Sequence, residues 1–195
     1  MCPARRDHGS QHKKATHGCA AGTGDDQVYF RVSGTTLLAS TLRKVTDRQL
    51  TITGPITISG GGAVQVMQVA LGARLNLMRL GIANGNNVST GKGGGIDNSF
   101  GTLAITNSNF ADNSSSVSSG GGNFSNERGA AASIKSTILA AAGNSSGNCA
   151  GTITDTGYNI SDDSTCNFSA TGTKTIPTPD FPRLAWPTTA DRLRL

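Results

Sequence analysis

A repeat of 28 residues constrains this chain more than any other feature of its sequence. "RLNLMRLGIANG" at 74–85 aligns with "TLAITNSNFADN" at 102–113 and with "AASIKSTILAAA" at 130–141. The expected core consists of the apolar residues at matching repeat positions: Leu75, Leu77, Ile82, Leu103, Ile105, Phe110 and Ile138. A glycine triplet precedes each copy, so the expected turn glycines are Gly60, Gly61, Gly62, Gly93, Gly94, Gly95, Gly120, Gly121 and Gly122. The middle copy and its glycine triplet resemble a flexible linker in composition, but the repeat shows that they are a unit of a repeating fold.

The spacing of apolar residues inside each copy predicts short strands. An L-x-L pattern followed by an apolar residue five positions on indicates two strands with a bend between them, and the glycine triplet introduces a third. Such a coil buries its apolar side only when coils stack at about 4.8 Å. We therefore predict an all-β fold, a right-handed, single-stranded parallel β-helix of about four coils with disordered ends. Segment 49–69 adds one or two of these coils, and segment 25–40 forms the first strands.

Short polar side chains lie near the expected bends of the coils: Asn107, Asn109, Asn113 and Asn144. Asparagine tolerates the left-handed backbone conformation that tight bends need, and its side chain can bond to its own backbone. Stacked coils can also align such amides into ladders. These residues are therefore interpreted as corner formers and not as catalytic groups.

The distribution of charge argues against binding to nucleic acid. Between residues 50 and 170 there are five Lys and Arg against six Asp and Glu, so the net charge of +5 arises at the two ends of the chain. A nucleic-acid groove needs clustered cations with stacking aromatics between them. No apolar run approaches the roughly 18–20 residues that span a bilayer, and no apolar region of a signal peptide is visible.

The repeat register brings together no catalytic, cofactor or metal site. Arg79, Asn107 and Lys135 form one polar column, but it holds no carboxylate of the kind that a glycan-cleaving enzyme uses. Asp97 aligns with Phe124, so it too has no acidic neighbour in the next copy. We therefore expect no enzyme site, no cofactor and no bound metal.

The two ends of the chain differ from the repeat in composition. The first residues contain His8, His12, His17 and Cys19, whose spacing matches no standard zinc pattern. The predicted organisation is a polar, disordered head at 1–24, a parallel β-helix at 25–172 and an irregular Pro-rich tail at 173–195.

Three stretches resemble a known group of proteins: "GDDQVYFRVSGTTLLASTL" (24–42), "GGGIDNSFGTLAITNSNFADNSS" (93–115) and "GNCAGTITDTGYNISDDSTCNF" (147–168). They are similar to repeats of bacterial surface and secreted β-helix proteins with a pectin-lyase-like fold, of the CSLREA-type and polymorphic-outer-membrane-protein-like families. The head motif that names the first of these families is missing, so we expect a fragment or a diverged copy.

Two cysteines late in the chain, Cys149 and Cys166, are candidates for a disulfide. The resemblance favours this pairing together with an oxidising setting, and a bond that closes such a loop would contribute about 3 kcal/mol. The alternative is two free, buried thiols.

The expected function is a structural or adhesive role of a non-enzymatic, secreted or surface-displayed protein. The expected partners are glycans or host and cell-surface proteins, and we expect self-association through uncapped ends. The resemblance implies that the parent protein is extracellular or lies at the cell surface. Two alternatives stay open: a polysaccharide lyase or glycoside hydrolase of the pectin-lyase-like fold, and a misread fragment without a function of its own.

Overall fold

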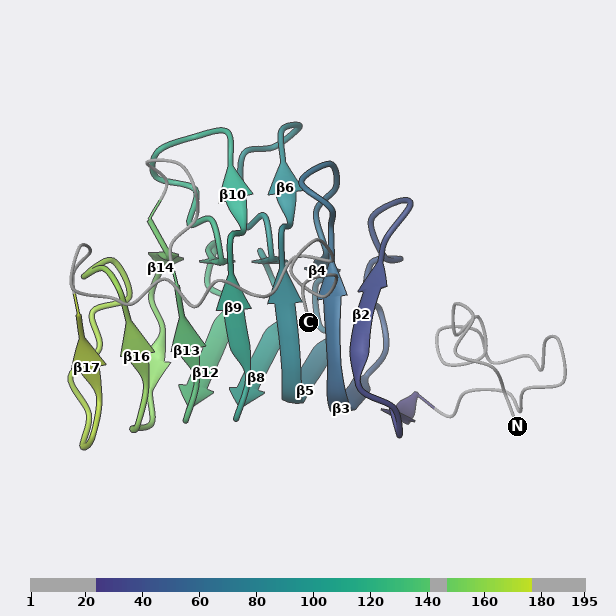
Figure 1. The fold of residues 1–195 in the computed structure, drawn as a ribbon, viewed down its shortest axis with the longest axis horizontal. Coiled ribbons are helices and arrows are strands. Elements are labelled where there is room, and N and C mark those ends of the chain that lie inside the picture. Colours follow the sequence, from purple (N-terminus) through teal and green to yellow (C-terminus); the bar gives the residue numbers. More distant parts are fainter. Residues whose placement is uncertain (1–23, 141–146, 177–195) are drawn as a thin grey trace, which may run out of the picture.

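The chain forms a parallel β-helix of about five turns in a computed structural model that describes residues 24–140 and 147–176. The strands stack side by side along the long axis of the molecule, from β2 to β17 (Figure 1). The described residues contain strands and no helix. The predicted all-β parallel β-helix is confirmed. The expected number of coils was too small, because the segments after the third repeat copy add further strands to the stack.

Three parallel sheets build the turns. The wide sheet contains β1 (Asp25–Tyr29), β2 (Gly34–Leu37), β3 (Gln49–Ser59), β5 (Arg74–Ala83), β8 (Thr102–Thr106), β9 (Asn109–Ala111), β12 (Ala131–Lys135), β13 (Ile138–Leu139), β15 (Thr154–Asp155), β16 (Ile160–Ser161) and β17 (Lys174–Thr175). The narrow sheet contains β4 (Met67–Val69), β7 (Ile96–Asn98), β11 (Phe124–Asn126) and β14 (Cys149–Gly151). A small two-stranded sheet pairs β6 (Asn86–Asn87) with β10 (Ser114–Ser115).

The core is a set of apolar columns that run through successive turns. Leu50, Leu75, Leu103 and Ala132 form one column, and Ile52, Leu77, Ile105 and Ile134 form the next. All of these side chains are buried, while the residues between them face outward or toward a neighbouring strand. Each buried Leu or Ile contributes about 1.5–3 kcal/mol relative to an exposed one. The alternation predicted from the sequence therefore forms the core of the wide sheet.

The third repeat copy is offset by one residue from the predicted alignment. Leu139, and not Ile138, lies beside Phe110 and is fully buried, whereas Ile138 pairs with Asn109. The cause is the turn that follows each strand of the narrow sheet. This turn has three residues after β7, at 99–101, and four after β11, at 127–130. The expected core position Ile138 is corrected to Leu139. The other predicted core residues are all buried.

A line of left-handed residues, here named the bend ridge, separates the two halves of the wide sheet. It consists of Arg79, Asn107, Ser136 and Tyr158, with φ angles between 49° and 60°. Asn107 thus takes the predicted role of a corner former. The predicted column is corrected at one position, because Lys135 pairs with Thr106 and Ser136 occupies the bend.

The other asparagines predicted as corners have different places. Asn109 begins β9, and Asn144 lies outside the described residues. Asn113 is fully buried and belongs to an amide ladder. Its side chain donates to Asn123 at 2.7 Å, Asn123 donates to Asn148 at 2.6 Å, and Asn148 donates to the Asp162 carboxylate at 2.6 Å. The expected ladder of side-chain amides therefore exists, and it lies inside the solenoid.

The predicted turn glycines make room for close packing beside this ladder. A Cβ atom on Gly94 would lie 1.9 Å from the backbone oxygen of Ser114, a distance that no side chain allows. A Cβ atom on Gly95 would lie 2.5 Å from the backbone oxygen of Asn123. At these positions glycine is required by the close approach of neighbouring turns.

A disulfide joins Cys149 in β14 to Cys166, with Cα atoms 4.9 Å apart. This confirms the predicted pairing and excludes the alternative of two free thiols at these positions. Both cysteines are buried and pack against the apolar core. The bond therefore fastens the loop after β16 to the narrow sheet.

Asp155 organises the last described turn of the solenoid. Its carboxylate accepts backbone N–H bonds from Gly157, Ser169 and Ala170 at 2.8–2.9 Å and a side-chain bond from Asn159 at 2.7 Å. Partial burial acts to raise the pKa of Asp155, but these hydrogen bonds outweigh it and hold the pKa below its ordinary value. The ionised carboxylate therefore stabilises the loop of this turn.

The expected boundary at residue 172 falls inside the solenoid. The backbone N–H groups of Lys174 and Ile176 donate to the preceding turn at 2.8 and 2.7 Å, so β17 belongs to the stack. The head, with its histidines and Cys19, and the tail beyond residue 176 lie outside the described residues. No helix in the described part of the chain has the length and hydropathy needed to cross a bilayer.

Candidate functional site

The outer face of the narrow sheet is the place where charged and polar side chains of neighbouring turns meet. Its strands alternate, so Met67, Ile96 and Phe124 point into the core. The column between them consists of Gln68, Asp97, Ser125 and Ala150, of which Gln68, Asp97 and Ala150 are partly exposed and Ser125 is fully buried. The predicted alignment of Asp97 with Phe124 is therefore corrected, because the register places Asp97 beside Ser125.

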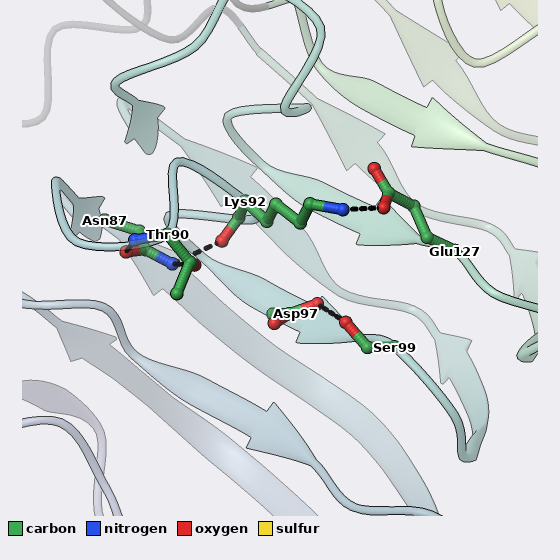
Figure 2. A network of polar contacts seen from close by, with 6 residues as sticks. All are labelled: Asn87, Thr90, Lys92, Asp97, Ser99 and Glu127. Atoms are coloured by element: carbon green, nitrogen blue, oxygen red, sulfur yellow. Dashed lines mark hydrogen bonds and ion pairs between the residues drawn. The ribbon is translucent and has the colours of Figure 1, made fainter.

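An ion pair between Lys92 and Glu127 crosses this face (Figure 2). Lys92 lies in the loop between β6 and β7, and Glu127 follows β11 in the next turn. About a quarter of each side chain is exposed, at 27% and 26%. The backbone oxygen of Lys92 accepts bonds from the Asn87 and Gln65 side chains at 2.6 and 2.9 Å, which fix the loop that carries the lysine. The pair therefore links two turns at a fixed position.

Asp97 and Glu127 are the carboxylates that neighbouring turns bring to this face. Figure 2 shows the Glu127 carboxylate directed at the Lys92 ammonium and the Asp97 carboxylate directed at Ser99. The Ser99 hydroxyl donates to Asp97 at 2.6 Å within the same turn. A glycosidase needs two carboxyl groups that face a shared space between them. Here each carboxylate is bonded to a different partner.

The sequence did not indicate the contact between Lys92 and Glu127. They lie 35 residues apart, which exceeds one repeat length, because both belong to turns and not to the repeating strands. A search for opposite charges in the turns of consecutive copies would have found the pair. Their contact, however, also depends on the lengths of both turns.

The described residues contain no group of three or more His, Cys, Asp or Glu side chains that could hold a metal ion. A hollow of about 370 Å³ lies elsewhere, near the first turns of the wide sheet. It is lined by residues of three successive bends: Tyr29, Phe30, Arg31, Thr53, Gly54, Pro55 and Arg79. Its cations and aromatic rings are suited to a ligand with negative charge and an apolar face.

No protein-family model, no curated protein and no solved structure matches this chain.

Proposed function

We propose that the chain is a structural or adhesive β-helix module, without enzyme activity, of a secreted or surface-displayed protein. The observation that carries this proposal is the use of charged side chains as links within the solenoid. Lys92 is paired with Glu127 across two turns, and Asp155 binds the loop at 169–170 in the last described turn. Such contacts favour a rigid rod over a site with a free acid and a free base.

The secreted or surface location rests on two features. The Cys149–Cys166 disulfide is typical of proteins that fold in an oxidising compartment. The motifs at 93–115 and 147–168 resemble those of bacterial CSLREA-type and polymorphic-outer-membrane-protein-like surface proteins. We include in the proposal that the chain is a member of these families and that its fold is of the pectin-lyase-like type.

The competing function is a polysaccharide lyase or glycoside hydrolase. It would use Asp97 and Glu127, because these carboxylates come from adjacent turns on one face. Their separate partners, Ser99 and Lys92, favour the structural role.

A paired measurement of binding and turnover tests the proposal. The purified chain is incubated with a panel of neutral and acidic polysaccharides, and we measure both retention on the immobilised glycan and release of reducing or unsaturated ends. We expect retention on some members and no release above that of a heat-denatured control. Release that is lost in both Asp97→Asn and Glu127→Gln would overturn the proposal in favour of an enzyme.

A further inference from the structure

A column of outward-facing residues runs beside the bend ridge on the wide sheet. The strand registers place these residues next to one another in successive turns: Tyr29, Thr53, Met78, Thr106 and Lys135. Tyr29 is 63% exposed and Met78 is 39% exposed, and Lys135 is also exposed. Neighbouring turns are separated by about 4.8 Å, so this column extends along the rod. It therefore offers a linear surface to an elongated ligand.

The hollow near Tyr29 begins this surface. In β3 the two residues Gly54 and Pro55 lie opposite the single residue Arg79 of β5, which is a β-bulge. A Cβ atom on Gly54 would lie 2.6 Å from Phe30, so the backbone of the first turn rests directly on this bulge. The extra residue makes a step in the bend, and the hollow of about 370 Å³ lies at this step.

The charge of the surface is positive. Arg31, Arg79 and Lys135 form no ion pair with another described residue. The described residues of the outward column, the bend ridge and the lining of the hollow include no Asp or Glu. The three cations come from every second turn, which corresponds to about 10 Å between successive cations along the rod. A chain with regularly spaced anions complements this arrangement.

Arg79 occupies a backbone conformation that arginine rarely adopts, with φ at 60°. The equivalent position of the next turn holds Asn107, whose side chain tolerates this conformation more readily. The fold therefore accepts asparagine at this bend and does not require arginine. Arg128, Ser136 and Tyr158 adopt the same conformation, so the charge and position of Arg79, and not its backbone, support a role in binding.

We propose that this surface binds a linear anionic polysaccharide, whose carboxylate or sulfate groups pair with Arg31, Arg79 and Lys135 while a sugar ring packs on Tyr29. The inference rests on the proposed adhesive function and gives it a ligand class and a location. The site lies on the wide sheet, so it is separate from the Lys92–Glu127 pair on the narrow sheet.

The test uses substitutions that copy the residue of a neighbouring turn and so preserve the fold. Arg79→Asn copies Asn107. The matched control is Arg74→Thr, a change on the same strand as Arg79 that copies Thr102 of the next turn. Both variants lose one positive charge. Lys135→Thr, which copies Thr106, is a second variant of the surface. Circular dichroism confirms that each variant folds.

Binding is measured by calorimetry with polygalacturonate, heparin, neutral dextran and a single-stranded DNA oligonucleotide at the same ionic strength. We expect the wild type to bind one of the two acidic polysaccharides, with the tighter ligand identifying carboxylate or sulfate as the preferred group. Arg79→Asn and Lys135→Thr should each weaken this binding by about tenfold, and Arg74→Thr by less than about twofold.

Four results would overturn the inference: no binding to either acidic polysaccharide, unchanged binding in the surface variants, an equal loss in Arg74→Thr, or DNA bound as tightly as the polysaccharides. These failures differ from a failure of the proposed function. Glycan binding that persists in the surface variants overturns only this site. Absence of all glycan and cell-surface binding, or turnover of a polysaccharide, overturns the adhesive role itself.

Discussion

The carboxylate of Asp155 has a structural role that the sequence does not reveal, because an acidic residue in a turn is usually hydrated. In this molecule one oxygen accepts a bond from Gly157, directly after β15, and the other accepts a bond from Ala170 in the loop before β17. The side chain therefore acts as a connection between β15 and the following loop.

We expect Asp155→Asn to lower the free energy of unfolding by about 1–2 kcal/mol, because a partly exposed carboxylate loses part of its hydrogen-bond strength to solvent. The pKa of Asp155 is lower in the folded chain than in the unfolded one. Its contribution is therefore complete above the ordinary pKa of aspartate and is lost as the pH falls through the lower, folded value.

Urea unfolding between neutral and strongly acidic pH measures this contribution. The variant should lose the part of the acid dependence that Asp155 supplies, whereas Asp112→Asn, at a left-handed turn position, should keep it. Identical pH profiles for the wild type and Asp155→Asn would contradict the prediction.

At the scale of strands and turns, the apolar pattern was sufficient to predict the fold but not the register of the third copy. Leu75 and Leu77 alternate as a strand requires, Ile82 lies beyond the bend at Arg79, and all three are fully buried. Ile138 and Leu139 are adjacent apolar residues, so the sequence alone does not say which one faces the core. The choice depends on the longer turn at 127–130, which carries no apolar pattern.

The candidate functional site was less predictable than the core. Lys92 and Glu127 meet because two turns of different lengths fold over the same face, and no repeat position marks either residue. The repeat register placed Arg79, Asn107 and Lys135 in one column. The one-residue offset of the third copy puts Lys135 in the neighbouring column instead, beside Thr106.

The amide ladder predicts a large effect for one substitution. Asn123 is fully buried, accepts a bond from Asn113, and donates to Asn148 and to the backbone oxygen of Ala140. Asn123→Ala removes one bond from each of three partners, of which Asn113 and Asn148 are fully buried, so we expect a loss of about 3 kcal/mol or more in the free energy of unfolding. Asn109→Ala, on the exposed side of β9, is the control and should cost less than about 1 kcal/mol. Chemical denaturation compares the two, and equal midpoints would refute the role of the ladder.

The disulfide gives a second prediction at the scale of elements. Reduction of Cys149–Cys166 should lower the free energy of unfolding by about 3 kcal/mol, since it opens the loop between two cysteines whose sequence separation is 17. Thermal melts followed by circular dichroism with and without reductant measure this effect. A Cys149→Ser/Cys166→Ser double variant should melt early and should not respond to reductant at this bond. An unchanged melting temperature of the wild type on reduction would be inconsistent with a stabilising bond.

At the scale of the whole molecule, the first described turn forms an edge, because β2 has no second partner strand among residues 24–140 and 147–176. β2 pairs with β3 on one side, and all four of its residues are exposed. Leu37 in this strand is 70% exposed and Val32 before it is 68% exposed. Unpaired strands with exposed apolar side chains favour pairing with another chain. The self-association expected from the sequence stays a prediction and is assigned to this edge.

Light scattering after size exclusion tests the assignment. We expect an average mass that rises with protein concentration for the wild type and a smaller rise for Leu37→Lys, because a charge on an edge strand opposes pairing. Leu71→Lys, which changes an exposed apolar residue in a turn, is the control. A wild-type mass that stays monomeric over the whole concentration range would exclude association through this edge.

The amide ladder also bears on how the gene can change. Each internal asparagine accepts one bond from the preceding side and donates one toward the following side, from the Gly85 N–H at one end to the Asp162 carboxylate at the other. A duplicated segment that carries one such asparagine enters the series with its acceptor and its donor already matched. In-frame duplication of a coil therefore lengthens the rod without a new core having to evolve, and loss of a coil shortens it in the same way.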